Sequence, residues 1–430
     1  MARSPKPRIS NPSSTACWPV SPVKSPDLSR KRVYITGMGA ATAAGLGVPA
    51  LWQAAREGQS AIGPLEVARE LRHNIRIAGQ LRGFDPAAHI EPDVLAFCDR
   101  FTQLAIVAGD EALAQAGFAR DDKLGERTAT IVGTGVGGGE TIEIGIHNAY
   151  VTGQRLDPWS VPRLMPNGAA SQLSARHGAR GPSFAVGSAC ASGTQAIGLG
   201  AHFIRAGIID RAVVGGAEAC ITASGMKGWE ALRVLSPNAC RPFSKDRNGM
   251  VLGEGAAIFV LESEESARAR GATPLAELCG YGTSSDAGDI VRPDAGGAAS
   301  AMRQALADAG LEPEAIDYVN AHGTGTLAND ATEAAALAAV FGERLPGLPV
   351  SSTKPVHGHA LGAAGAIELA ITVMALREGV VPPTLNWTTP DPRCDLDCVP
   401  GQKRAVTMRH AMTNSFAFGG INAVLIVGQA

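Results

Sequence analysis

Cys190 is the residue of this chain whose surroundings best suit nucleophilic chemistry. It lies in Val186-Gly-Ser-Ala-Cys-Ala-Ser-Gly-Thr-Gln-Ala196, among neighbours too small to crowd the sulfur. A buried strand is predicted over 182–186 and a helix over 194–206, so the cysteine falls at a strand-to-helix turn. Ser192 followed by Gln195 fits a capping box, and N–H groups at a helix start favour a thiolate. Taken alone, the same window fits a small buried hydrophobe better than a nucleophile, because that is the commoner role of cysteine.

Two later stretches carry further side chains that can hold or move protons. Asn320-Ala-His-Gly-Thr-Gly-Thr326 places His322 at a predicted strand end, beside glycines that let a ligand approach the backbone. Ser351-Ser-Thr-Lys-Pro-Val-His-Gly-His359 offers Lys354 and His359 before a predicted helix. A lone histidine is usually a hydrogen-bonded structural residue, and a lone lysine a solvated charge. Three such residues at strand-to-helix turns favour a shared site.

The chain also contains two segments of similar sequence, which indicates an internal repeat. Ala112-Leu-Ala-Gln-Ala-Gly-Phe118 and Ala305-Leu-Ala-Asp-Ala-Gly-Leu311 each end a helix before a strand that runs into a glycine-rich turn. We therefore predict a duplicated α/β unit, with one half over 31–271 carrying the nucleophile and another over 272–430 carrying the histidines and lysine. Sites in α/β sheets form at strand ends, so the turns of both halves are expected to meet at the centre.

Composition excludes several classes of protein. The 38 basic and 40 acidic residues give a net charge of −2, which offers no electrostatic case for nucleic acid or an anionic membrane. No apolar run is long enough for a membrane span. The 8 cysteines are scattered, which indicates reduced thiols in a cytoplasmic protein. No metal site is predicted. Residues 1–30, rich in Ser and Pro, are expected to be a disordered tail, with a transit peptide or a leftover extension as alternatives.

A glycine loop supports a rival hypothesis. Gly133-Thr-Gly-Val-Gly-Gly-Gly139 follows a predicted strand and fits the pattern of a dinucleotide-binding domain, with Asp157 as the ribose partner. The chain would then be an NAD-binding oxidoreductase. The signal is weak, because glycine clusters also follow Val214 and Val319.

Taken together, the motifs resemble those of the β-ketoacyl-acyl carrier protein synthases, condensing enzymes of the thiolase superfamily, and most closely the type II elongating kind. The resemblance spans roughly residues 31–430 in the family's order and rests on the Cys190 turn, 241–255, the His322 loop, 354–359, 362–368 and 414–422. Cys394-Asp-Leu-Asp397 and the His-Gly-Thr-Gly-Thr form also resemble the nodulation protein E branch.

The resemblance implies a thiolase-like duplicated αβαβα layered fold, a homodimer and a decarboxylative Claisen condensation. Cys190 would take an acyl chain from a carrier-protein thioester, and malonyl carrier protein would lose carbon dioxide to give an enolate. His322 and His359 match the histidines that hydrogen-bond the thioester carbonyl and stabilise the enolate. Lys354 matches a lysine that pairs with the glutamate equivalent to Glu368.

Other positions are assigned by the same resemblance. The backbone N–H groups of Cys190 and Phe418 match the oxyanion hole, and Phe418 is also the gate to the acyl pocket. Thr324 and Thr326 match positions that hydrogen-bond the phosphopantetheine arm of the carrier protein, so no resident cofactor is expected. Asp330 and Glu333 match acids that we interpret as structural.

Two departures from the family pattern, at Ala417 and Pro355, carry structural expectations. Ala417 replaces a glycine, which should stiffen the gating turn because alanine resists positive φ. Pro355 should bias Lys354 toward an extended backbone. The remaining alternative is a non-catalytic chain-length partner of a synthase heterodimer. Such subunits lack the nucleophile, so Cys190 argues against it.

Overall fold

The computed structural model describes residues 31–67 and 74–430, so the tail expected over 1–30 lies outside the described residues. A central sheet of 11 strands dominates this part of the chain, in the spatial order β11-β10-β14-β15-β9-β1-β8-β7-β5-β6, with β2 on β1. Its strands are β1 (Val33–Thr42), β2 (Gly45–Leu46), β5 (Thr128–Gly133), β6 (Ser183–Val186), β7 (Arg211–Glu218), β8 (Gly255–Ser263), β9 (Ala276–Ser285), β10 (Tyr318–Asn320), β11 (Val350–Ser351), β14 (His410–Ala417) and β15 (Ile421–Gly428).

The sheet consists of two halves with the same topology. In chain order, the five strands of the first half are β1, β5, β6, β7 and β8. From the edge of the sheet inward, the order is β6 (third in the chain), β5 (second), β7 (fourth), β8 (fifth) and β1 (first). The strands β9, β10, β11, β14 and β15 repeat that order. In each half the second strand pairs in parallel with the third and fourth, and the fifth pairs antiparallel with the fourth and first. The predicted duplication is thus confirmed, while the exact boundary near Gly271 stays a prediction.

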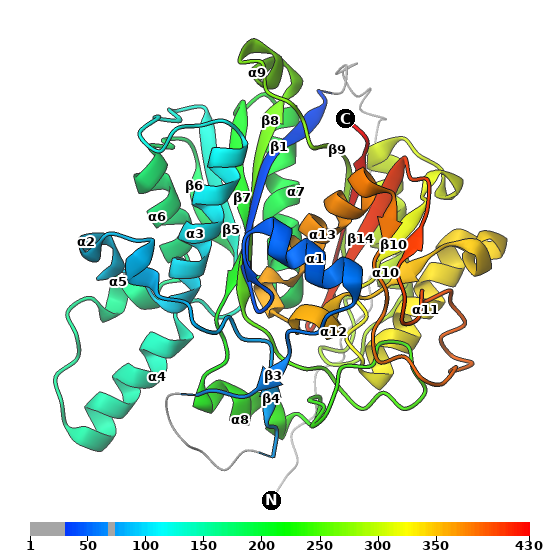
Figure 1. Cartoon of the computed structure of the whole chain (residues 1–430), viewed down its shortest axis with the longest axis horizontal. Helices are drawn as coiled ribbons and strands as arrows, with labels where there is room; N and C mark the ends of the chain where they lie inside the picture. The colour runs from blue at the N-terminus through cyan, green and yellow to red at the C-terminus, as the bar shows by residue number, and fades with distance from the viewer. Residues whose placement is uncertain (1–30, 68–73) are drawn as a thin grey trace, which may run out of the picture.

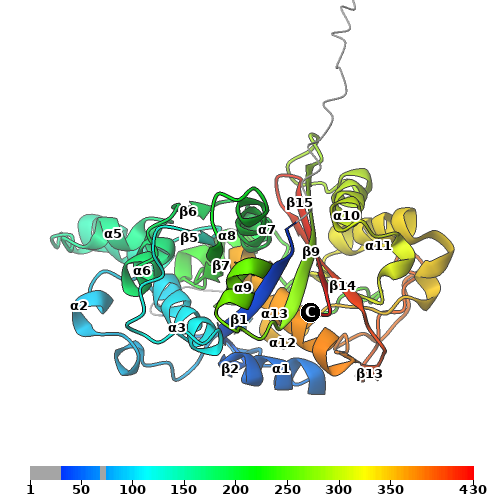
Figure 2. The ribbon, with the colours of Figure 1, turned by 90° about the horizontal axis from the view of Figure 1, so that it is seen from above.

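The halves form five layers around a central pair of helices (Figures 1 and 2). β1 and β9 pair only through Tyr34 with Glu277 and Ile35 with Ala276, so the halves diverge beyond this junction. Between them lie α7 (Ser192–Arg205) and α13 (Ala364–Glu378), each in contact with strands of both halves. Outside lie α3 (Arg100–Gln115) and α6 (Gly168–His177) on the first half, and α10 (Ala295–Ala309) with α11 (Leu327–Phe341) on the second. The expected αβαβα layers are present.

Glycine lets the starts of the two central helices approach each other closely. A Cβ at Gly193 would lie 2.9 Å from the carbonyl oxygen of Gly362, and a Cβ at Gly365 would lie 1.9 Å from Thr194 Oγ1. Only a residue without a side chain fits at such distances. This approach places the turn before α7 directly beside the turn before α13.

The remaining elements are short and lie around this core. They are α1 (Val48–Glu57), α2 (Pro92–Leu95), α4 (Gly139–His147), α5 (Ser160–Leu164), α8 (Ala223–Ala231), α9 (Glu264–Ala269), α12 (Lys354–His357), β3 (Gly63–Pro64), β4 (Ile77–Ala78), β12 (Val380–Val381) and β13 (Arg404–Ala405). Over 31–67 and 74–430, no helix combines the length and the apolar character needed to cross a bilayer.

Candidate active site

Cys190 lies in the turn between β6 and α7, in the short 3-10 segment Ala189–Ala191, and its side chain is buried. Ala189 has φ 47°, a left-handed conformation that is uncommon for alanine and marks local strain. The hydroxyl of Ser192 fixes the turn, because it accepts from Ser188 N at 2.8 Å and donates to Ala189 O at 2.7 Å. The predicted strand-to-helix turn is confirmed, and α7 begins at Ser192.

The predicted capping box is wrong. Ser192 is the first residue of α7 rather than its N-cap, which is Ala191 and supplies no side-chain cap. Gln195 instead donates from Nε2 to Thr283 Oγ1 at 3.0 Å, which links α7 to β9 of the other half. The Ser192 hydroxyl therefore fixes the turn before α7, Gln195 makes a tertiary contact, and neither side chain caps the helix.

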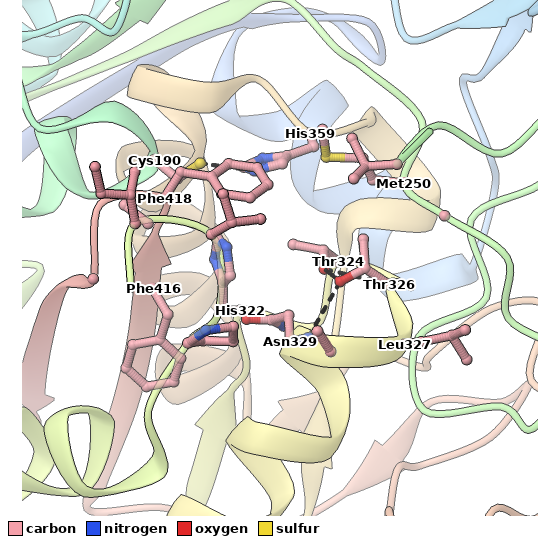
Figure 3. Close-up of a pocket in the computed structure, with 18 of the residues that line it drawn as sticks. Cys190, Met250, His322, Thr324, Thr326, Leu327, Asn329, His359, Phe416 and Phe418 are labelled. Carbon is pink, nitrogen blue, oxygen red and sulfur yellow. Dashed lines mark hydrogen bonds between the residues drawn. The ribbon is translucent and has the colours of Figure 1, made fainter. Parts of the chain in front are cut away.

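Both predicted histidines lie near the sulfur and come from the second half of the chain, and His359 contacts it (Figure 3). His359 Nε2 lies 3.2 Å from Cys190 Sγ. The rings of His322 and His359 meet edge to face with centroids 5.3 Å apart. One donor atom from each of Cys190, His322 and His359 lies within 4.8 Å of the others. Thiolate and imidazole are also the ligands that zinc prefers, and the absence of a metal stays a prediction.

Lys354 orients His322 rather than touching the sulfur. Its ammonium group is fully buried, lies 3.3 Å from His322 Nδ1, and donates to the His322 carbonyl oxygen and to Glu368 Oε1. These contacts use all three of its donors. A protonated lysine makes Nδ1 of His322 an acceptor, so the ring carries its proton on Nε2. The predicted Lys354–Glu368 pair is present.

The expectation that Pro355 extends the backbone of Lys354 is wrong. Lys354 is the first residue of α12, and Pro355 lies in its first turn. Proline is tolerated there because an N–H in the first helical turn has no intrahelical partner.

Carboxylates from α11 hold the His322 loop in place, as interpreted from the sequence. Glu333 accepts from the backbone N–H groups of His322 and Gly323, each at 2.8 Å. Thr326 caps α11, and its hydroxyl lies 2.9 Å from that of Thr324. The two threonines thus stand together at the start of this helix.

A pocket of about 300 Å³ leads from the protein surface to the sulfur. Its inner end is formed by Cys190, His322 and His359, and both Thr324 and Thr326 line its wall (Figure 3). Its outer end carries exposed apolar side chains, namely Ile290, Val291 and Leu327. Asn248, Gly249 and Met250 of the 241–255 stretch also line it, a role that the sequence did not reveal.

Phe418 lines the same pocket at the hairpin between β14 and β15, and its ring packs on Trp229 with centroids 5.9 Å apart. The expected stiffening by Ala417 is wrong. Ala417 is the last residue of β14, paired with Ile421, and the positive φ angles of 88° and 68° belong to Gly419 and Gly420. The turn therefore keeps its freedom at the two glycines.

In the resting site, the sulfur and both rings are neutral. Burial raises the pKa of Cys190 to about 12, and the Glu218 carboxylate adds to the rise. Lys354 and a hydrogen bond from the backbone N–H of Phe418 oppose it. Burial, together with the charge of Lys354, holds the pKa of His322 and of His359 well below the usual range. The helix start does not by itself produce the thiolate that the sequence suggested.

The glycine loop at 133–139 does not offer a phosphate cradle. The backbone N–H groups of Gly135 and Val136 donate to the buried carboxylate of Glu218, at 2.6 and 3.3 Å. Asp157, the suggested ribose partner, instead pairs with Arg163 at 3.0 Å. The dinucleotide-binding alternative is therefore not supported. Glu218 was missed from the sequence, although an acid that ends an apolar strand was a signal for it.

A duplicated αβαβα fold with a cysteine and two histidines at its centre defines a thiolase-like acyltransferase. The family model described as "Beta-ketoacyl synthase, N-terminal domain" matches residues 30–267, and that of the C-terminal domain matches 275–388. The chain belongs to the β-ketoacyl synthase family. It is an acyltransferase, a β-ketoacyl-acyl carrier protein synthase of the elongating kind.

Relatives cover almost the whole chain. Nodulation protein E of Rhizobium sp. (strain N33) is 46% identical over 93% of this chain and 99% of its own length. The 3-oxoacyl-acyl-carrier-protein synthase 2 of Staphylococcus aureus (strain N315) is 43% identical over 92% and 98%. A solved type II PKS ketosynthase, in complex with its acyl-carrier protein, superposes with a TM-score of 0.85 at 30% identity, covering 93% of this chain and 100% of that one. The resemblance seen in the motifs is confirmed.

Proposed function

We propose that Cys190 carries the growing acyl chain and that His322 and His359 promote its condensation with a malonyl group. The observation that carries this proposal is the 3.2 Å contact between His359 Nε2 and Cys190 Sγ at the inner end of a pocket open to the surface. A buried thiol at the end of a narrow pocket suits a substrate delivered on a flexible arm. Phosphopantetheine on an acyl carrier protein is such an arm.

In the first half-reaction the acyl group moves to the enzyme. The sulfur of Cys190 attacks the thioester carbonyl carbon, and the oxyanion is stabilised by the backbone N–H groups of Cys190 and Phe418. His359 Nε2 is the nearest base for the thiol proton. As the tetrahedral intermediate collapses, the bond to the pantetheine sulfur breaks, and that sulfur leaves with the proton.

In the second half-reaction a carbon–carbon bond forms. The malonyl carboxylate leaves as carbon dioxide, and its electron pair becomes an enolate. The low pKa of each ring keeps it neutral, so the N–H of His322, and that of His359 once its ring proton sits on Nε2, stabilise the enolate oxygen as hydrogen-bond donors. The enolate carbon attacks the acyl carbonyl, the bond to Cys190 Sγ breaks, and the thiolate takes a proton from water.

The carrier protein is the inferred partner, and no resident cofactor takes part. The solved ketosynthase described above is bound to an acyl-carrier protein, which supports this class of partner. The hydroxyls of Thr324 and Thr326 line the pocket, where they can hydrogen-bond the amides of the arm. Reduced thiols suit the cytoplasm, where we place the enzyme, and six cysteines of the described residues are free, namely Cys98, Cys190, Cys220, Cys240, Cys394 and Cys398.

A homodimer is the proposed assembly. An apolar face over 142–161, which we call the α4–α5 face, exposes Ile146, Tyr150, Val151 and Val161. It projects from the body of the molecule (Figure 1). Large exposed apolar patches mark interaction sites. β6 lies at the end of the sheet nearest this face, so its unpaired edge is also available to a second copy.

Replacement of the nucleophile tests the proposal. Cys190→Ala is expected to abolish acyl transfer, seen by mass spectrometry as loss of the acyl adduct after incubation with acyl carrier protein. Cys220→Ala, which removes another buried thiol, is the matched control and should keep the adduct. An adduct of unchanged yield on Cys190→Ala would refute the proposed role and revive the non-catalytic alternative.

A further inference from the structure

Glu218 is a buried carboxylate that the proposed chemistry does not use. It ends β7, has no exposed surface, and forms no ion pair within the described residues. Its oxygens accept four hydrogen bonds, from Gly135 N at 2.6 Å, Gly362 N at 3.1 Å, Thr134 Oγ1 at 3.2 Å and Val136 N at 3.3 Å. A buried charge without a counter-ion is costly, and these donors are what offsets the cost.

The donors come from both halves of the duplicated fold. Thr134, Gly135 and Val136 follow β5 in the first half, whereas Gly362 lies in the turn between His359 and α13 in the second. The carboxylate therefore joins the glycine loop of one half to the histidine turn of the other. This explains the glycine pattern that resembled a phosphate cradle, because the anion that it holds belongs to the protein.

The same carboxylate adjoins the nucleophile turn. A Cβ on Gly135 would lie 2.9 Å from Glu218 Oε2 and 3.8 Å from the Cα of Ala189, the neighbour of Cys190. Gly133, two residues earlier, packs on the backbone of Ser192 at the start of α7. The loop that Glu218 holds is thus in contact with the turn that presents the sulfur.

We propose that Glu218 is a positioning residue that clamps the Cys190 turn against the His359 turn and that its negative charge makes the buried sulfur harder to ionise. This inference rests on the nucleophile role proposed for Cys190. The carboxylate then has two effects that can be separated. The length of its side chain lets it hold both turns, and its charge opposes ionisation of the sulfur. A purely structural residue would have only the first.

Several groups act on the ionisation of the sulfur, and they must be considered together. The charged or titratable groups that face it come from β7, the loop after β7, the His322 loop, α12, the His359 turn and α13. They are Glu218, Cys220, His322, Lys354, His359 and Glu368. Lys354 favours the thiolate, and the two glutamates oppose it. Burial raises the pKa of Glu218 to about 7, so its charge is present above neutrality, where thiols ionise.

Alkylation of Cys190 measures the charge effect directly and needs no substrate. The adduct of iodoacetamide on the Cys190 peptide is followed by mass spectrometry from pH 6 to 9.5. Glu218→Gln removes the charge, so its alkylation rate at pH 8.5 is expected to rise about three- to ten-fold, the effect of removing one nearby like charge. Glu218→Asp keeps the charge but loses reach, so its alkylation should match the wild type while its acyl transfer slows.

Glu262→Gln is the matched control. Glu262 is another buried glutamate, on β8, held by Arg270 and Thr36 far from the sulfur, and its substitution should leave the alkylation profile unchanged. Equal profiles for Glu218→Gln and the wild type would overturn the charge effect. Full transfer activity in Glu218→Asp would overturn the clamp.

A milder substitution keeps the test open if Glu218→Gln does not fold. Thr134→Val removes one donor, so Glu218 holds its proton to a higher pH and carries less charge near neutrality. Alkylation of Cys190 at pH 7.5 should then be faster than in the wild type, and an unchanged rate would count against the proposal. Because these measurements use the free sulfur, they are independent of whether Cys190 accepts acyl groups.

Discussion

Lys354 Nζ lies 3.3 Å from His322 Nδ1 and also donates to the backbone carbonyl of the same histidine. A single buried ammonium group thereby fixes both the loop and the tautomer of the ring that faces the pocket. Glu368, fully buried on α13, is its counter-ion. If the pair acts on the reaction as proposed, it does so through His322, so its effect on stability can be separated from its effect on catalysis.

Lys354→Met is expected to lower the free energy of unfolding by about 3–5 kcal/mol, because Glu368 is left as an uncompensated buried acid. The double variant Lys354→Met with Glu368→Leu should regain most of this loss in urea unfolding, since an apolar pair can replace a buried ion pair. Malonyl decarboxylation should stay low in both, as neither fixes the proton of His322. A double variant with normal decarboxylation would show that the pair serves stability alone.

Substitutions of the two histidines are expected to affect the two half-reactions differently. His322→Ala should reduce malonyl decarboxylation about 10²–10³-fold, the usual cost of one lost oxyanion donor. Self-acylation of Cys190 should persist in this variant, because His322 does not contact the sulfur. In His359→Ala both steps should slow, since His359 Nε2 lies 3.2 Å from Cys190 Sγ. Carbon dioxide release and the acyl adduct report the two steps.

His89→Ala is the control for these substitutions, because His89 is exposed and lies on a different segment before α2. It should retain both activities. Equal loss of self-acylation in His322→Ala and His359→Ala would contradict the division of roles inferred from the geometry.

The side chains of the candidate site were predictable because each follows a local signal. Cys190, His322 and Lys354 all stand where an apolar strand ends and small residues begin, and the repeated helix-strand pattern indicated that these turns meet. The spacing of apolar residues in a strand and the glycine that ends it both fall within about a dozen residues, so they can be recognised from the sequence. The five-layered arrangement followed from the family resemblance rather than from those signals.

The missed features depend on contacts between distant parts of the chain. Glu218 binds Gly135, 83 residues away, and Gly362, 144 residues away. An acid at the end of an apolar strand is a local signal, but nothing local identifies a glycine loop as its partner. The capping box failed for the same reason, since Gln195 is drawn to Thr283 of the other half. The ionisation of Cys190 was also misjudged, because burial is a property of the whole fold.

His357 is expected to make the protein sensitive to acid. It is fully buried, and burial with the charge of Lys354 lowers its pKa to about 3. A histidine with a lowered folded-state pKa stabilises the fold above its unfolded pKa, and this contribution is lost as the pH falls below about 6.5. Between pH 7.5 and 5 the loss amounts to about 2 kcal/mol for this residue.

His357→Gln should therefore show a smaller drop in unfolding free energy between pH 7.5 and 5 than the wild type, by about 2 kcal/mol. Urea unfolding at the two pH values measures it. His322 and His359 act in the same direction, while Glu218 and Glu368, whose pKa values are raised to about 7, act in the opposite one, so the comparison is made between variants. An unchanged drop would mean that His357 takes up a proton in the folded state.

Charge placed on the α4–α5 face tests the proposed homodimer. Ile146 and Val151 are 57% and 70% exposed, and apolar side chains this accessible are covered when a partner binds. Ile146→Glu with Val151→Glu should bury two unpaired carboxylates in the interface and shift the sedimentation mass to that of one chain. Leu46→Glu is the control, because Leu46 is also an exposed apolar residue but lies on β2 at a different part of the surface. It should leave the mass unchanged. A double variant that still sediments as two chains would place the interface elsewhere, and a wild type that sediments as one chain would remove the homodimer from the proposal.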